Sequence, residues 1–286
     1  MTLHKSGNLG KLNHEHLTTF GRKVMKRHLK IISLLETIIS KIKLFILSGI
    51  IAFSYNCEIA STTDDNISTN LLFIASEGNF GQNNGSISVF KDNEKIQELL
   101  NVGDVLQSIL VHDSHLYAII NGNSEIKRYA ISEAGLTLPG ITISTNNSSP
   151  REMCVLNNKL YFSNWNSKDI KVLNLNTFSI EQSISLNGLP EDITTDGSNL
   201  YASIPHLALY DQGNGTDVVK IDPLTNQITK TYEVGKGPQH LIIHNGNLFI
   251  SRTYYSENWY QTFFGTAQVN LTTDEVITLE HGEGIV

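Results

Sequence analysis

Residues 150–161 read PREMCVLNNKLY, and the same pattern returns along the chain. Gapless counterparts begin at Leu106, Pro190 and Pro238, and each ends in a leucine followed by an aromatic residue. A further Leu-Phe pair stands at 72–73, and the five pairs are spaced by 44, 44, 40 and 48 residues. A period of about 40–50 residues is typical of one β-propeller blade.

Each repeat predicts four short strands and no helix. A tight turn of residue types that tolerate a positive φ closes the first hairpin of each repeat. These turns lie at Asp113-Ser114, Asn157-Asn158, Asp196-Gly197 and Asn245-Gly246. Third strands are expected over 126–131, 170–175 and 218–221, and fourth strands over 180–186 and 228–234.

A sheet of four such strands is apolar on both faces, so it is stable only when neighbouring sheets cover it. The sequence therefore predicts an all-β fold, a β-propeller of four-stranded blades. A β-sandwich is the alternative all-β fold, but nothing in it requires the sequence to repeat at this spacing.

Five repeats are visible, and both ends are short. The residues before Leu71 are polar, so the first blade lacks its innermost strand. Residues 281–286, aligned on 234–239, stop two residues into what would be the inner strand of a following blade. We therefore expect a truncated last repeat and a propeller that is incomplete at its C-terminus; a small five-bladed ring is the alternative.

The 286-residue chain starts with a basic segment. Residues 1–56 hold 9 of the 21 Lys and Arg residues but only 2 of the 28 Asp and Glu residues. The uncharged apolar run 44–53 has the length of a signal-peptide core and is shorter than the ~20 residues that a membrane-spanning helix needs. Ala52 and Ser54 fit cleavage ahead of Tyr55.

Cys57 directly follows this segment. A cysteine at such a place can be the lipidated residue of a bacterial lipoprotein, although residues 54–56 match the usual small residues poorly; an ordinary linker cysteine is the alternative. The expected organisation is an N-terminal extension with a signal peptide over 1–56, a polar linker over 57–70 and a β-propeller domain over 71–286.

Beyond residue 56 the chain is acidic, with 26 Asp and Glu residues against 12 Lys and Arg residues. Such a surface repels phosphate backbones, so we expect no nucleic-acid partner and an easier fit for cations or basic ligands.

Three phrases in the repeats carry a resemblance to a known family: KLYFSNW at 159–165, VKIDPLTN at 219–226 and VGKGP at 234–238. They resemble the YVTN-type, YncE-like β-propeller repeat of bacterial exported proteins, within the WD40-like superfamily. The opening EGNFG at 77–81 is similar to the "NEGNFG" start of uncharacterised, often lipid-anchored envelope propellers, with Ser76 in place of the first Asn.

The resemblance covers roughly residues 70–286 and implies an exported protein of the bacterial periplasm or outer-membrane surface. Contact with the membrane is expected only through a lipid anchor at Cys57. The resemblance does not fix a function, because fold does not determine function. Propellers of related lineage include lactonases and large subunits of quinoprotein dehydrogenases, which keeps an enzymatic alternative open.

The positions just after the first residue of each repeat are the strongest candidates for a binding site. They are equivalent in successive blades, so they should form a ring at the channel mouth, and they are polar and differ from blade to blade: Gln107, Ser108, Arg151, Glu152, Glu191, Asp192, Gln239 and His240. Loops after the second strands supply a second tier: Glu77, Asn79, Phe80, Asn121, Asn164, Trp165, His206, Arg252 and Tyr254. The alternative is that inner strands simply face channel water.

Arg151 and Arg252 are the best candidates for holding a carboxylate by paired hydrogen bonds. Alternatively, neighbouring Glu152 or Glu257 neutralises each of them. Trp165 is placed either to stack on a flat or sugar-like ligand or to pack between blades.

The remaining motifs suggest no chemistry. Residues 211–217, DQGNGTD, are loosely like a calcium loop but lack the downstream bidentate Glu, so a Gly-rich hairpin is expected. The aromatic loop expected over 253–266 suits protein contact or covering its own blade. No nucleophile elbow, phosphate-binding loop or dinucleotide fingerprint is present.

The sequence therefore predicts no catalytic residue, metal or cofactor. It indicates a module that binds an unknown small ligand or an envelope protein. A lactonase-like hydrolase or a quinoprotein-dehydrogenase-like accessory subunit is the alternative.

Overall fold

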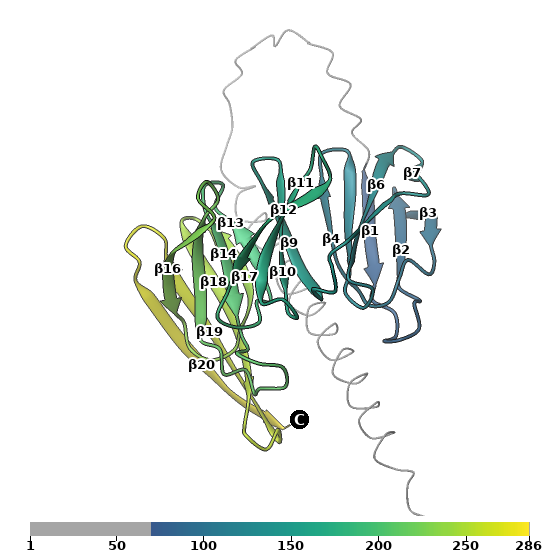
Figure 1. Cartoon of the computed structure of the whole chain (residues 1–286). Helices are drawn as coiled ribbons and strands as arrows, with labels where there is room; N and C mark the ends of the chain where they lie inside the picture. The colour runs from purple at the N-terminus through teal and green to yellow at the C-terminus, as the bar shows by residue number, and fades with distance from the viewer. Residues whose placement is uncertain (1–69, 286) are drawn as a thin grey trace, which may run out of the picture. The chain divides into compact units, whose positions relative to one another are not determined.

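The computed structural model describes residues 70–285, whose regular elements are all β-strands (Figure 1). They form five sheets that follow one another in chain order. The first two sheets contain β1 (Leu71–Ser76), β2 (Ser86–Lys91) and β3 (Glu94–Leu99), then β4 (Leu106–His112), β5 (His115–Ile120), β6 (Glu125–Ser132), β7 (Gly135–Leu136) and β8 (Ile141–Ser144).

The last three sheets have four strands each, joined as antiparallel meanders. They contain β9 (Pro150–Leu156), β10 (Lys159–Asn164), β11 (Asp169–Asn174) and β12 (Ser179–Ser185); β13 (Ile193–Thr195), β14 (Leu200–Ile204), β15 (Asp217–Asp222) and β16 (Gln227–Glu233); and β17 (Pro238–His244), β18 (Asn247–Tyr255), β19 (Gln261–Asn270) and β20 (Val276–Ile285). The all-β propeller architecture predicted from the repeats is confirmed.

The first two sheets depart from four strands in different ways. Within the described residues the first sheet consists of the three strands β1, β2 and β3, and the residues that precede β1 in the chain lie outside the described part. In the second sheet β7 and β8 both pair with β6, so this blade has two short outer pieces.

The predicted hairpin turns occur where the sequence places them, with one difference in geometry. Asn157 and Asn158 both have positive φ, and so do Asp113, Asn245 and Gly246. Asp196-Gly197, in contrast, opens a four-residue loop over 196–199. The Asp196 carboxylate accepts hydrogen bonds from the backbone N–H groups of Ser198 (2.8 Å) and Asn199 (2.6 Å), an arrangement that a two-residue hairpin cannot provide.

The leucine–aromatic pair links each blade to both of its neighbours. Successive strand residues point to opposite faces of a sheet, so the leucine packs toward the preceding blade and the aromatic ring toward the following one. Within the buried clusters Tyr117 joins Leu160, Tyr161 joins Leu200, and Tyr201 joins Leu248. Each of these side chains is at most 3% exposed. The repeated pair is therefore the packing unit of the fold.

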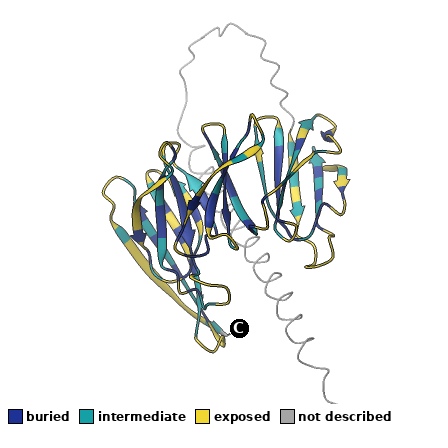
Figure 2. Ribbon diagram, viewed as in Figure 1, coloured by how far each residue is buried: buried dark blue, intermediate teal, exposed yellow. Residues whose placement is uncertain are grey.

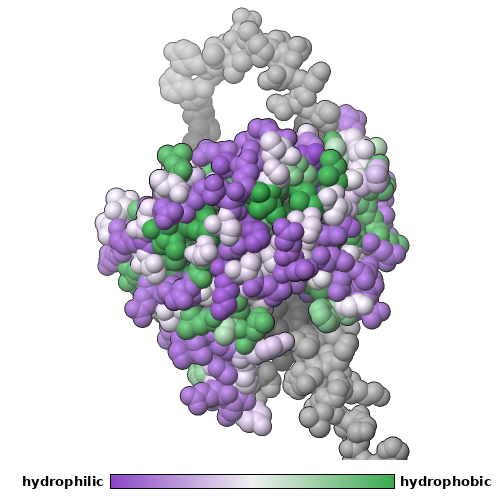
Figure 3. All heavy atoms as spheres, viewed as in Figure 1, coloured by the Kyte–Doolittle hydropathy of each residue, from purple (hydrophilic) through white to green (hydrophobic). Residues whose placement is uncertain are grey.

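The same positions are exposed on the two outward faces of the sheet series. Leu72 is 57% exposed and Phe249 is 41% exposed, because none of the described residues packs on either of them from a further blade. Figure 2 shows the contrast between the dark, buried middle sheets and the exposed strand β20, and Figure 3 shows apolar side chains reaching the surface among hydrophilic ones.

Residues 281–285 differ from the expectation. They do not start the inner strand of another blade but continue β20, which pairs with β19 as far as Gln261 opposite Ile285. The aromatic loop expected over 253–266 is likewise part of a long hairpin, with only residues 256–260 between β18 and β19. The rings of Tyr254 and Phe263, which are paired across the two strands, stack with their centroids 5.0 Å apart and stabilise this extension of the hairpin.

The signal-peptide and lipidation predictions, with Cys57 and the cleavage position, lie outside the described residues. Across residues 70–285 there is no helix long and apolar enough to cross a membrane.

Leu200→Ala and Leu72→Ala test the packing unit at one repeat position, inside the series and at its end. Removing the Leu200 side chain leaves a cavity beside Tyr161, so we expect the free energy of unfolding to fall by about 2–5 kcal/mol. In the monomer, Leu72→Ala should cost less than about 1 kcal/mol, because Leu72 is already exposed. Urea denaturation at a protein concentration low enough to keep the chain monomeric measures both variants. Equal losses would mean that the outer face of the first sheet is covered within the monomer.

Candidate binding site on the inner strands

The predicted ring positions come together because the inner strands β4, β9, β13 and β17 are neighbours. Their contacts join residues one repeat apart: the Arg151 guanidinium donates to Gln107 Oε1 (2.9 Å), 44 residues away, and to both carboxylate oxygens of Glu191, 40 residues away. We call this group the inner-strand cluster; it consists of Gln107, Ser108, Arg151, Glu152, Glu191, Asp192 and His240.

Arg151 is the centre of the cluster. Its Nε and Nη2 atoms donate to Glu191 at 3.1 and 2.7 Å, a bidentate pair. Its guanidinium carbon lies 4.3 Å from the ring centroid of Trp165, so Trp165 stacks on Arg151. Burial is the largest single effect and lowers the pKa of Arg151, but the charge and hydrogen bonds of Glu191, together with the charges of Glu152 and Glu77, raise it by more in total, and the net shift is upward. Arg151 is thus a fixed cation whose donors are largely engaged.

Glu152 and Asp192 are carboxyl groups in a partly dry, negatively charged setting. Burial, with the nearby charges of Asp192 and Glu191, raises the pKa of Glu152 to about 8, although the Ser108 hydroxyl donates to its Oε2 at 2.6 Å. Burial likewise raises the pKa of Asp192 to about 6, against two backbone N–H donors at 2.7 Å. Glu152 is therefore mostly a neutral acid at pH 7, and Asp192 mostly a carboxylate.

His240 stands at the edge of the cluster. Its Nδ1 lies 3.9 Å from Asp192 Oδ2, and about half of its side chain is exposed. Loss of hydration among the inner strands lowers its pKa, and the charge of Glu191 partly opposes this. The carbonyl oxygen of Gln239, its neighbour on β17, accepts a hydrogen bond from the Ser203 hydroxyl at 2.7 Å.

Three serines that sequence reasoning did not single out hold the cluster in place. The hydroxyls of Ser163, Ser203 and Ser251 accept the backbone N–H of Glu152, Asp192 and His240, at 3.0–3.1 Å. Ser163 also donates to the carbonyl oxygen of Glu191 at 2.6 Å, so it connects neighbouring blades. The signal was present in the sequence, since each serine stands three residues after the leucine of its Leu-aromatic pair.

The second-tier asparagines bond within the fold. Asn121 donates to Ser149 Oγ (3.0 Å) and to the carbonyl oxygen of Pro150 (2.9 Å), which ties the second blade to the third. Asn164 is fully buried; it donates to the carbonyl oxygen of Phe162 (3.0 Å) and accepts from Ser148 Oγ (2.5 Å). Both side chains serve blade packing, and neither presents a group to the inner-strand cluster.

Arg252 is also engaged within its own blade. It is buried, donates to the carbonyl oxygen of Lys236 (3.1 Å) and pairs with Glu280 (2.6 Å). The acidic partners expected from sequence were Glu152 for Arg151 and Glu257 for Arg252. The structure assigns Glu191 and Glu280 instead, because pairing is set by strands that lie side by side in space.

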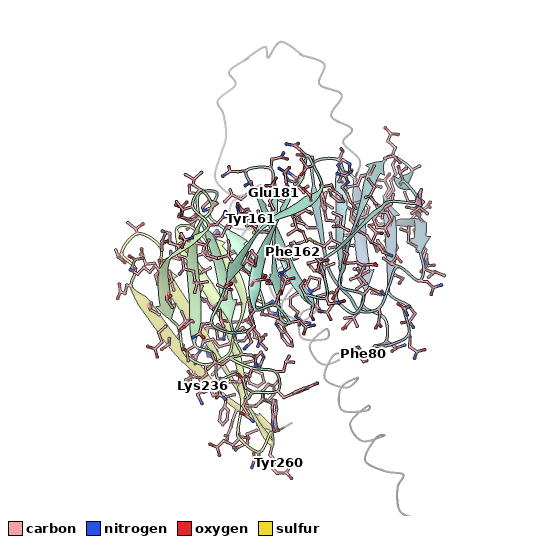
Figure 4. The ribbon with its side chains drawn as sticks, in the orientation of Figure 1. Phe80, Tyr161, Phe162, Glu181, Lys236 and Tyr260 are labelled. Atoms are coloured by element: carbon pink, nitrogen blue, oxygen red, sulfur yellow. The ribbon has the colours of Figure 1, made fainter. Side chains whose placement is uncertain are left out.

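The loop after β1 is divided between the cluster and solvent. The charge of Glu77 is close enough to contribute to the raised pKa of Arg151. The backbone N–H of Asn79 donates to Asn84 Oδ1 at 2.7 Å, and Phe80 projects outward, as Figure 4 shows, together with Tyr260 in the long hairpin. Glu77 is thus the one second-tier carboxylate with an electrostatic link to the cluster among residues 70–285.

The residues likened to a calcium loop make their own hydrogen bonds. Asp211 accepts from the N–H groups of Leu207, Ala208, Gly213 and Asn214 and lies 2.6 Å from His206 Nδ1. This arrangement fits the Gly-rich hairpin alternative. No three potential metal ligands converge anywhere in the described part of the chain.

Comparison with known proteins supports the fold and leaves the family open. No protein-family model and no curated protein sequence matches the chain. Among solved structures it is similar to hydrazine synthase of Kuenenia stuttgartiensis (13% identity, TM-score 0.56, covering 68% of this chain and 60% of that one). It is also similar to the Pan2 WD40 domain of Neurospora crassa (14%, 0.55, 72% and 61%).

A third similar structure is a protein of unknown function from Bacteroides caccae (12% identity, TM-score 0.50, covering 68% of this chain and 74% of that one). The fold is a β-propeller, similar to that of the Pan2 WD40 domain. The chain spans about three fifths of the length of the first two structures. At identities this low the likeness shows the fold alone.

Glu152→Gln tests the buried acid. The pKa of Glu152 rises from 4.5 to about 8 on folding, so the folded state keeps a proton that the unfolded state loses. The contribution of this proton to the free energy of unfolding is complete below pH 4.5 and is lost as the pH rises toward 8. Because the side chain is only partly buried, we expect the free energy of unfolding of the wild type to fall by about 1–2 kcal/mol over this range. Gln keeps the acceptor for Ser108 and should flatten the profile.

Urea denaturation between pH 5 and pH 8 measures this profile, and Glu94→Gln on an exposed strand position is the matched control. A Glu152→Gln profile as steep as that of the wild type would show that Glu152 is ionised in the folded protein.

Proposed function

We propose that this protein is an exported binding module of the bacterial cell envelope and that its ligand contacts the inner-strand cluster. The observation that carries the proposal is the convergence of repeat-equivalent side chains that differ in chemistry from blade to blade. A purely structural channel lining would gain nothing from placing Glu152 and Asp192 where burial raises the pKa of both.

The engaged arginines indicate the chemistry of the ligand. Arg151 is held by Glu191 and Gln107, and Arg252 by Glu280, so neither has paired donors ready for a carboxylate. The remaining groups, Glu152 and Asp192, are acceptors or become acceptors on losing a proton. A ligand that donates hydrogen bonds and carries positive charge, such as an amine, suits this set, and the acidic chain attracts it.

The protein family and the cellular location are part of the same proposal. The phrases at 159–165, 219–226 and 234–238 support membership of the YVTN-type, YncE-like exported propellers. The basic start and the apolar run 44–53 support export to the periplasm or the outer-membrane surface.

A matched pair of probes tests the ligand class. By calorimetry, 1,4-diaminobutane should bind and succinate, with the same carbon count, should not. Glu152→Gln and Asp192→Asn should each weaken diamine binding tenfold or more, because each removes a carboxylate that can pair with an ammonium group. Glu94→Gln should bind as the wild type does. Tighter binding of succinate, or full diamine binding by both cluster variants, would overturn the proposed ligand class.

Intact mass of the protein recovered from its native cells tests export. A chain starting at Tyr55, or one starting at a lipid-bearing Cys57, supports the proposal, and the second form adds the anchor. Recovery of the chain with residues 1–54 still attached would contradict export.

A further inference from the structure

The two outward faces of the sheet series are apolar and differ from one another. We define the Leu72 face as Leu72, Ile74 and Phe90, on β1 and β2. We define the Phe249 face as Ile242, Phe249, Ile277 and Leu279, on β17, β18 and β20. Each of these side chains except Phe90 is at least 41% exposed. Soluble monomeric proteins rarely expose several large apolar side chains together on one surface.

These faces are the two halves of an interface that the molecule already builds four times. At every junction between blades, the face that carries the aromatic residue of one blade covers the face that carries the leucine of the next. Among the described residues, Leu72 is the repeat leucine with no aromatic residue of a preceding blade on it, and Phe249 is the repeat aromatic with no leucine of a following blade on it. Each face is therefore one half of a blade junction whose other half is not supplied by residues 70–285.

The Leu72 face is hollowed and the Phe249 face carries a row of apolar side chains. The hollow has a volume of about 400 Å³ and is lined by the apolar Leu72, Ile74 and Phe90 and by the polar Asn70, Asp92 and Asn93. The Phe249 face presents a cross-strand row in which Phe249 lies opposite Ile242 and, across Gln268, in line with Ile277. On the Leu72 face Lys95 and Glu98 form an ion pair at 2.9 Å. The two charges neutralise each other, so this pair does not oppose docking.

We propose that the Leu72 face of one molecule packs on the Phe249 face of a second copy, so that the protein associates head to tail through one more blade junction. The occupant is a second copy because the chain itself carries the complementary half. Since the two faces differ, the contact is heterologous, and its rotation decides whether copies close into a ring or extend as a chain. The proposal is independent of the ligand at the inner-strand cluster.

Charged substitutions on either face test this directly. Leu72→Glu and Phe249→Glu each destroy one half of the junction and leave the other intact. By sedimentation velocity over a hundredfold range of concentration, the wild type should form dimers or larger species, and each variant alone should remain monomeric. An equimolar mixture of the two variants should form dimers and nothing larger, because one intact junction remains between them.

Leu224→Glu is the matched control, because Leu224 is an exposed apolar residue in the turn between β15 and β16, away from both faces; it should associate as the wild type does. Circular dichroism checks folding, and Ile74→Glu with Ile277→Glu repeats the test at neighbouring exposed positions. A monomeric wild type throughout the range overturns the proposal. So does a single-face variant that still dimerises, since that result means like faces pair.

Discussion

The packing of an aromatic ring from one blade on a leucine of the next is the interaction on which this structure depends. A four-stranded meander that is apolar on both faces cannot shield itself, so each sheet depends on neighbouring sheets to bury its faces. Tyr117 with Leu160, Tyr161 with Leu200 and Tyr201 with Leu248 repeat this contact through the middle of the molecule. At the two ends of the sheet series, no other described residue buries Leu72 or Phe249, and both side chains are exposed.

The same stacking creates the candidate site. When identical modules are placed face to face, equivalent positions on the inner strands come within hydrogen-bonding distance, as Gln107, Arg151 and Glu191 do. Residues that stand one repeat apart in the sequence are therefore in contact in the structure. These polar positions differ from blade to blade, whereas the blade junctions are maintained by the leucine–aromatic pairs and by the serines that fix the inner strands.

Electrostatics then separates groups that look alike in the sequence. Glu191 is ion-paired with Arg151, whereas Glu152 has the Ser108 hydroxyl and two acidic neighbours, so burial raises its pKa to about 8. Neighbouring carboxyl groups thus carry different protonation states at neutral pH, which gives the cluster both a fixed ion pair and proton-dependent acceptors.

The sequence by itself determined the blade, the strand order and the repeat positions that meet near the inner strands, because two-residue alternation and turn chemistry are local properties. It also contained the serines of the Leu-aromatic-x-Ser pattern, although their role is legible only once the partners are known. The partners of Arg151 and Arg252, the blade-packing roles of Asn121 and Asn164, and the continuation of β20 through residue 285 were decided by tertiary structure. These partners and packing roles depend on which strands lie side by side and on how much water remains between them. The spacing of residues along the chain specifies neither the neighbouring strands nor the degree of burial.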